Sequence, residues 1–353
     1  MSEAWFEKKE CDTGCIISSK CRLARNIDGF NFSPKLDEES ARRMIDKTVE
    51  QIRRDPKLNG NRFYDFKNMS LTQKQEMQEQ HSISNYLVGQ KEAAGFISDD
   101  RSVSLMINEE DHIRIQTFSA GAHLDTAFKE ANRLDDELGR ILPYVYSDKY
   151  GYLTTCLSST GTGMRASYFL HLPVLALAGQ IETVKTEISR FNVTLKPVTG
   201  EGRKSPADVY QITNTMTLGV REEDVISSLQ KITAQIVAQE QAYEKQYFTQ
   251  QRDHAIDAVW RCYATLKFAR MLSYSDALVM LSQIRLGLNA GIIRPAADNA
   301  VSSIYALMIQ IQPASLQTYY GKEMIGDELE KARANFLRTN LPEMADAVSS
   351  QKQ

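Results

Sequence analysis

The sequence is poor in the residues that build disulfide frameworks and metal centres. It has five cysteines in 353 residues, an odd number, and none of them forms a CxxC pair. This usage fits a reducing compartment better than a disulfide-bonded secreted fold. Cys11, Cys15 and Cys21 are close in sequence, but no histidine lies near them. Free thiols are therefore favoured over a zinc site, and we expect no metal held by protein side chains alone.

Long apolar runs and an excess of one charge are also missing. No apolar stretch approaches the ~20 residues of a membrane span, and the N-terminus MSEAWFEKKECDTG is acidic and polar. The net charge is −3 and the pI is about 6.0, so nothing in the overall charge indicates nucleic acid or a membrane surface as the main partner. We expect a cytoplasmic protein. With 42% hydrophobic residues, the chain can bury a large core.

The sequence pattern changes near residue 250. Before it, strand-like runs alternate with amphipathic helices such as 36–54 and 122–142, and a long polar helix is expected over 221–250. From about residue 253 the pattern is entirely helical. We expect an α+β domain over residues 1–250, followed by a helical domain over residues 251–353.

One strand-like run, INEEDHIRIQ over residues 107–116, is unusually charged. In a strand, alternate residues share a face. A continuous strand would place Glu110 and Arg114 on one face, beside His112 and Gln116. The opposite face would carry Glu109, Asp111, Ile113 and Ile115. A solvent-exposed face with cross-strand ion pairs is the plain alternative.

Two further strands carry cations. In SSKCRLARN, Lys20 and Arg22 share one face, while Cys21 points to the other, and Arg165 opens the run RASYFLHL directly after a glycine loop. Planar guanidinium groups on a rigid sheet suit a polyphosphate, because each can bond two phosphate oxygens. The pattern predicts a nucleotide site that has no P-loop.

Two glycine motifs are weaker alternatives. GTGMRA, residues 161–166, fits the loose dinucleotide-binding pattern, with Glu182 near the offset expected for a ribose-binding acid. That pattern should open a helix, whereas the residues that follow it here predict a strand ended by Pro173. GEGRKS, residues 200–205, lacks the spacing of a Walker loop.

Taken together, NEEDHIRIQ, SSKCRLAR, CLSSTGTGMRAS and the TGEG loop with DVYQITN resemble the phosphagen (ATP:guanido) kinase superfamily. The closest likeness is to bacterial protein arginine kinases of the McsB type. It covers about residues 15–250 and continues more weakly to the C-terminus. The resemblance implies a mainly antiparallel sheet flanked by helices, then a helical domain for substrate binding and dimerisation. Kinases of small guanidino metabolites carry a further N-terminal domain before the first arginine motif, which here begins at Ser18.

The resemblance implies roles for individual residues. Glu110 would be the catalytic carboxylate, and Glu201 the second carboxylate that holds the substrate guanidinium. Transfer from ATP would require Mg²⁺. The residues that would contact the nucleotide are Ser18, Ser19, Lys20, Cys21, Arg22, His81, Arg114, Arg165, Ala166, Ser167, Lys196 and Gly200. For His81, an exposed loop histidine is the plain alternative.

The chain departs from the family pattern at several positions. Lys20 and Lys196 stand where relatives usually have arginine, so a bidentate phosphate contact becomes a point contact. Leu-Ser-Ser-Thr after Cys156 replaces a Pro-Thr-Asn-like run, and LEKARA over 329–334 replaces an RDxxRA element that binds phosphoarginine. A weakly active or inactive pseudokinase that acts as an adaptor through its helical domain is therefore the alternative function. A kinase of small guanidino metabolites is a third.

The resemblance also implies partners. These are arginine-containing protein substrates such as a stress-response repressor, a small zinc-binding activator protein, a Clp-type protease that degrades marked proteins, and a second copy of the chain in a homodimer.

Overall fold

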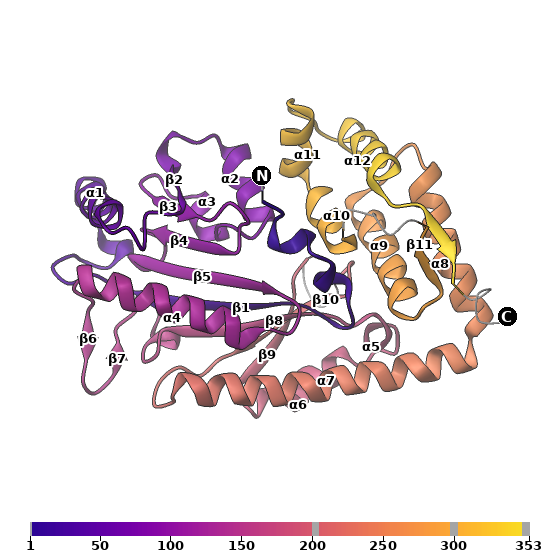
Figure 1. Cartoon of the computed structure of the whole chain (residues 1–353), viewed down its shortest axis with the longest axis horizontal. Helices are drawn as coiled ribbons and strands as arrows, with labels where there is room; N and C mark the ends of the chain where they lie inside the picture. Colours follow the sequence, from indigo (N-terminus) through magenta and orange to yellow (C-terminus); the bar gives the residue numbers. More distant parts are fainter. Residues whose placement is uncertain (1, 200–204, 297–302, 348–353) are drawn as a thin grey trace.

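The computed structural model describes residues 2–199, 205–296 and 303–347, and its centre is one eight-stranded sheet. All neighbouring strands run antiparallel, in the order β2-β3-β4-β5-β1-β8-β10-β9. Figure 1 shows this sheet, with helices along one side and a separate helical region at one end. The strands of the sheet are β1 Ile16–Arg25, β2 Arg62–Asp65, β3 Ala94–Ile97, β4 Val103–Ile107, β5 Ile113–Ala120, β8 Met164–His171, β9 Val193–Pro197 and β10 Val209–Asn214.

Helices cover both faces of the sheet, but not to the same extent. The helices of this part are α1 Glu38–Arg54, α2 Leu71–Glu79, α3 Asn85–Val88, α4 Leu124–Ile141, α5 Pro173–Leu177, α6 Ile181–Ser189 and α7 Glu222–Gln250. Apolar residues of α1, α4, α6 and α7 form one continuous core with the face that carries Cys21, Leu23 and Ile115. On the opposite face, α2 and α3 cover only the part around Met106.

The start of α1 shows how local sequence sets an element. Asp37 is the N-cap residue, and its carboxylate accepts a hydrogen bond from the Ser40 N–H at 2.7 Å. Acids occupy the first turn and arginines the last, as the helix dipole favours.

The C-terminal region is helical and packs as a second core. It contains α8 Arg252–Phe268, α9 Tyr274–Asn289, α10 Ile304–Gln310, α11 Pro313–Tyr320 and α12 Asp327–Asn340, with the small ribbon of β11 Ile293–Pro295 and β12 Met344–Asp346. Trp5, Phe6 and Cys11 from the N-terminal segment belong to this core, as do Phe118 and Phe169 of the sheet. The expected α+β architecture with a helical C-terminal part is confirmed. The domain boundary at residue 250 stays a prediction.

The expectation of one continuous strand over residues 107–116 was wrong. Residues 107–116 are not one strand, because β4 ends at Ile107 and β5 begins at Ile113. The acids between them form the turn of a hairpin, which starts with Asn108 at a φ of +62°. The left-handed backbone at Asn108 ends the strand here. Outside the main sheet, the short strand β7, Gly151–Tyr152, pairs with β6, Tyr146–Ser147.

No helix in the described ranges is long and apolar enough to cross a membrane.

Candidate active site

The strand register places the cations on one face of the sheet. Arg22 of β1 lies opposite Gln116 of β5 and Arg165 of β8, and Ala24 lies opposite Arg114. Residues opposite each other in an antiparallel pair point to the same side. Arg114 is two residues from Gln116, so it shares this side with Arg22. We call Lys20, Arg22, Arg114 and Arg165 together the cation face; it lies opposite the main core, as expected.

The side chain of Arg22 has no hydrogen bond or ion pair with the described residues. Its Nε atom is buried without a hydrogen-bond partner among the described residues, and so is the Nε of Arg114. Burial, with repulsion from Arg114, lowers the pKa of Arg22 from 12.5 to about 9. A buried guanidinium without a carboxylate partner is costly. The site is therefore organised for an anion from outside the chain.

Arg165 is held by backbone carbonyls. Its Nη1 donates to Asn214 O at 2.6 Å, and its Nη2 donates to Ser158 O at 2.7 Å. Thr217 Oγ1 donates to Thr160 O at 2.7 Å and fastens the same loop. The guanidinium is thus fixed at one end of the cation face before any ligand arrives.

The two adjacent glutamates of the hairpin have different environments. Glu109 is 2% exposed; it accepts a hydrogen bond from Ser84 Oγ at 2.6 Å and is paired with Arg114. Glu110 is partly exposed and has no hydrogen-bond partner among the described residues. Burial, with repulsion from Glu109 and Asp111, raises its pKa, while Arg22 and Arg114 oppose the rise. Glu110 therefore carries the free carboxylate beside the cations.

The expected face-sharing along 107–116 needs correction. Arg114 pairs with Glu109, which sequence alternation had placed on the other face. His112 does not lie beside Arg114; its Nδ1 accepts from Ile27 N at 2.9 Å, and its Nε2 lies 2.8 Å from Asn31 O. The turn rotates these side chains out of the period-two pattern.

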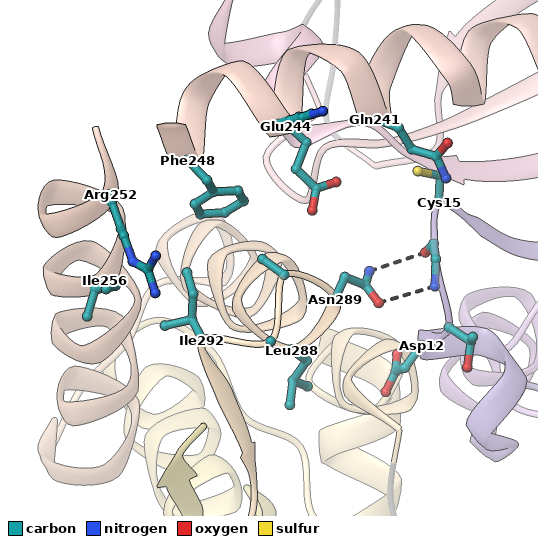
Figure 2. A pocket seen from close by; sticks show the side chains of 15 residues that line it. Asp12, Cys15, Gln241, Glu244, Phe248, Arg252, Ile256, Leu288, Asn289 and Ile292 are labelled. Carbon is teal, nitrogen blue, oxygen red and sulfur yellow. Dashed lines mark hydrogen bonds between the residues drawn. The ribbon is translucent and has the colours of Figure 1, made fainter. Parts of the chain in front are cut away.

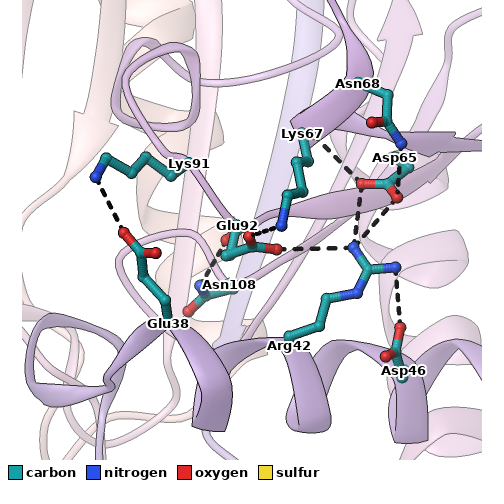
Figure 3. A network of polar contacts seen from close by, with 9 residues as sticks. All are labelled: Glu38, Arg42, Asp46, Asp65, Lys67, Asn68, Lys91, Glu92 and Asn108. Carbon is teal, nitrogen blue, oxygen red and sulfur yellow. Dashed lines mark hydrogen bonds and ion pairs between the residues drawn. The ribbon is translucent and has the colours of Figure 1, made fainter.

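A polar network behind the hairpin was not predicted (Figure 3). Asn108 Nδ2 donates to Glu92 O at 2.7 Å, which anchors the residue before Glu109. The Glu92 carboxylate pairs with Lys67, and Arg42 lies 3.7 Å from it. These residues come from separate elements, so no local sequence pattern could have indicated the cluster.

Three more residues of the predicted nucleotide site lie on this face, and their contacts with a nucleotide stay predictions. Lys20 lies with its Nζ 5.1 Å from the centre of the Phe118 ring, and burial followed by Arg114 and Arg22 lowers its pKa. Ser167 Oγ lies 2.7 Å from Thr213 Oγ1, opposite Lys20 in the register. Lys196, on the outermost strand β9, is exposed.

Three residues of the predicted nucleotide site have side chains that point away from the cation face. The side chains of Cys21 and Ala166 lie in the main core, on the far side of the sheet, and both are fully buried. Burial raises the pKa of the Cys21 thiol to about 12. Ser19 Oγ donates to Gly121 O at 2.8 Å and is buried. Alternate residues of β1 and β8 face opposite sides, so a contiguous motif cannot place every side chain at the ligand.

Ser18 and the TGEG residues complete the predicted set. Ser18 is fully buried, and its Oγ has no hydrogen-bond partner in the described part of the chain. Gly200 and Glu201 lie outside the described residues, so their roles stay predictions.

His81 is not an exposed loop histidine. Its ring packs against Phe169 at 5.3 Å and Phe118 at 6.0 Å between ring centroids. Gln116 Nε2 donates to His81 O at 2.7 Å, which ties the residue to the sheet beside Arg22. The histidine therefore lies at the edge of the cation face.

The glycines of the GTG loop have a packing role. A Cβ on Gly161 would lie 2.2 Å from Thr217 O, and φ is +114° there. A Cβ on Gly163 would lie 2.6 Å from Ala24 O. The motif leads into strand β8 at Met164, as expected, so the dinucleotide-binding interpretation is excluded.

A large cavity of about 830 Å³ lies apart from this face, between the sheet domain and the helical region (Figure 2). Its wall includes Glu244, Phe248 and Arg252, and Asn289 is hydrogen-bonded to Gly14 at one side. None of the predicted site residues in the described ranges lines it.

The fold and the cation face define a class, the ATP:guanido phosphotransferases. A family model described as the C-terminal catalytic domain of these enzymes matches residues 43–243. A solved structure of lombricine kinase has the same fold, with a TM-score of 0.58, 20% identity, and coverage of 69% of this chain and 70% of that one. A duplicated taurocyamine kinase from Schistosoma mansoni gives a TM-score of 0.57 at 24% identity, covering 64% of this chain and 33% of that one.

Within this class, the whole chain identifies one family. A second family model, the protein-arginine kinase McsB C-terminal domain, matches residues 252–352. A protein-arginine kinase of Clostridium kluyveri is 36% identical over 93% of this chain and 95% of its own length. One from Caldanaerobacter subterraneus is 33% identical over 94% and 98%. The chain belongs to the protein-arginine kinase family.

Proposed function

We propose that this protein transfers the γ-phosphate of ATP to arginine side chains of proteins. One observation carries the proposal: Arg22 and Arg114 keep buried donors without partners, directly beside the free carboxylate of Glu110. A polyphosphate would supply the missing acceptors and neutralise the charge. The relatives named protein-arginine kinase support the same reaction.

The acceptor arginine needs a carboxylate. Its guanidinium is protonated at neutral pH and becomes nucleophilic only as a proton leaves. Glu110 would orient the guanidinium and accept that proton as the N–P bond forms and the bond from the γ-phosphorus to the bridging oxygen of ADP breaks. The raised pKa of Glu110 makes it a better base than an ordinary glutamate. Glu201 would hold the other side of the guanidinium.

Mg²⁺ would neutralise phosphate charge and help to align the leaving group. No group of three or more potential metal-binding side chains is found among the described residues. Glu109 is already occupied by Ser84 and Arg114. We propose that the metal arrives on the nucleotide phosphates, and that Glu110 is the acid nearest to it.

A second candidate is a weakly active or inactive pseudokinase that works as an adaptor through its helical region. The lysines at positions 20 and 196 favour it, since lysine cannot form a bidentate phosphate contact. Marking of proteins for degradation, control of a repressor, a zinc-binding activator, a Clp-type protease partner, a homodimer and a cytoplasmic location remain proposals from the family resemblance.

The test is mass spectrometry of an arginine-rich protein incubated with ATP and Mg²⁺, without acid treatment because N–P bonds are acid labile. Wild type should produce phosphoarginine, and Glu110→Gln should reduce it by at least about 100-fold, the scale of general-base catalysis. Alanine at Glu130, a partly exposed residue of α4 paired with Arg133, is the control and should leave the rate unchanged. Absence of phosphoarginine with wild type, together with normal ATP binding, would favour the adaptor function instead.

A further inference from the structure

His81 joins the sheet to the helical region. Its backbone is left-handed, with φ at +59°, and Gln116 and the rings of Phe118 and Phe169 fix it at the edge of the cation face. Lys20 lies close enough to lower the pKa of the imidazole further, beyond the effect of burial. The ring therefore has a defined place beside the proposed phosphate site.

The other side of the ring meets Tyr305 of α10. The Tyr305 hydroxyl lies 3.2 Å from His81 Nε2, and the residue is 3% exposed. The start of α10 is itself anchored, because Asp12 accepts hydrogen bonds from the backbone N–H groups of Ile304 and Tyr305. Ser303 Oγ donates to Phe6 O at 2.7 Å. The phenol is thus held in place by the N-terminal segment.

The contact determines which nitrogen of His81 carries the proton. Burial lowers the pKa of His81 to about 3, so the imidazole is neutral and has one N–H. Burial also raises the pKa of Tyr305, so its hydroxyl keeps its single proton. Within the described residues, that hydroxyl has one hydrogen-bond partner, His81 Nε2.

With partners from the described residues alone, one arrangement satisfies both groups. If Nε2 carried the proton, the phenol oxygen would accept it and the buried phenol proton would have no acceptor, which costs about as much as a lost hydrogen bond. If the phenol donates to Nε2, both atoms are satisfied and the proton of His81 is on Nδ1. The side-chain hydrogen bond of His81 to the described residues uses Nε2, and the residue is partly exposed, so Nδ1–H is the donor left for a ligand.

We propose that Tyr305 is a positioning residue for nucleotide recognition: it fixes the tautomer of His81 so that Nδ1–H donates to an acceptor atom of ATP. The inference rests on the proposed function, because ATP must bind at the cation face for this donor to meet it. The acceptor is a ring nitrogen of the base or an oxygen of the ribose or phosphates, which share the same chemistry. The helical region thereby contributes to ATP binding as well as to protein contacts.

The test compares Tyr305→Phe with a matched control. Tyr320 is also in the helical region, and its hydroxyl donates to Ala332 O at 3.3 Å, within that region. Tyr320→Phe therefore removes a comparable hydroxyl that has no link to His81. The full-length protein is labelled with ¹⁵N-histidine, and the His81 ring signals are identified by their loss in His81→Asn.

In the unliganded wild type, the ¹⁵N shifts should show Nδ1 protonated and Nε2 unprotonated. Tyr305→Phe should give a mixture of tautomers and raise KM for ATP by about three- to tenfold, the effect of one net hydrogen bond. We expect kcat and KM for the protein substrate to change less than about twofold. Tyr320→Phe should match wild type in both measurements.

Two results would overturn the inference. One is a wild-type His81 protonated at Nε2. The other is a Tyr305→Phe protein in which His81 keeps the wild-type tautomer. This result is decisive whatever happens to KM for ATP or to kcat. Failure of the proposed function can be told apart from failure of this inference. In the first case the wild-type protein neither binds ATP nor forms phosphoarginine. The tautomer of His81 is measured without ligand and does not depend on that outcome.

Discussion

Arg22 and Arg25 lie three residues apart on β1, and methionine at each should change stability in opposite directions. Arg22 is half-buried, its Nε is buried without a hydrogen-bond partner among the described residues, and burial with repulsion from Arg114 lowers its pKa from 12.5 to about 9. At 1.36 kcal/mol per pKa unit, this corresponds to roughly 5 kcal/mol of unfavourable charge burial, which is an upper limit because the surroundings relax. We expect Arg22→Met to raise the free energy of unfolding of the unliganded protein by about 1–4 kcal/mol.

Arg25 is the matched control. Its Nη2 lies 2.6 Å from Asp135 Oδ2, and the two side chains are almost completely buried. Its guanidinium also donates to Thr162 O at 3.0 Å and lies 3.5 Å from the centre of the Tyr152 ring. Arg25→Met leaves the Asp135 carboxylate buried without its cation, and should lower the free energy of unfolding by about 3–5 kcal/mol.

The assays are urea denaturation without nucleotide and calorimetric titration with ATP. Arg22→Met should also weaken ATP binding by about 10- to 150-fold, since a hydrogen bond to a charged group contributes about 1.5–3 kcal/mol. The protein would thus become more stable as it loses ligand affinity. Destabilisation by Arg22→Met equal to that of Arg25→Met, or ATP affinity unchanged by Arg22→Met, would refute the interpretation of the cation face.

Three further predictions follow from single residues. Lys20→Arg should tighten ATP binding by about five- to tenfold in the same titration, by restoring a bidentate contact; weaker binding would contradict the placement of Lys20 beside the phosphates. Burial raises the pKa of Glu240 to about 7, so the folded state binds a proton more strongly than the unfolded chain, and stability should fall as pH rises from about 4.5 to 7. Glu240→Gln should remove up to about 3 kcal/mol of this fall in denaturation at pH 5 and pH 8; an unchanged slope would exclude Glu240 as its source. Gly161→Ala places a methyl group 2.2 Å from Thr217 O. In urea denaturation, it should lower the free energy of unfolding by more than about 2 kcal/mol. A change below about 0.5 kcal/mol would show that the loop adapts to the methyl group.

The sequence was sufficient to predict the faces of β1. Cys21 and Leu23 alternate with Lys20 and Arg22, and period-two alternation assigns such a strand when one face is buried. The strand β8 after the GTG loop was also predicted, since Pro173 closes it.

The hairpin at 108–112 could not be predicted in the same way. Alternation assumes that the strand continues, whereas Asn108 takes a left-handed conformation and the next residues leave the sheet. Which glutamate pairs with Arg114 then depends on Ser84, which is distant in sequence and occupies Glu109. Such pairings are properties of tertiary packing, and local patterns do not contain them.

The contribution of the helical region was also missed. Tyr305 follows His81 by more than two hundred residues, and nothing in the sequence around either residue indicates that their side chains meet. The pairing depends on how α10 packs against the N-terminal segment and the sheet.

The most direct test of the central claim is calorimetric titration of the wild-type protein with ATP, ADP, AMP and adenosine at two salt concentrations. If the unpartnered guanidinium groups of the cation face bind the phosphates, affinity should fall stepwise from ATP to AMP, adenosine should show no measurable binding, and added salt should weaken ATP most. Adenosine that binds as tightly as ATP, or no heat with any of the four, would contradict the account.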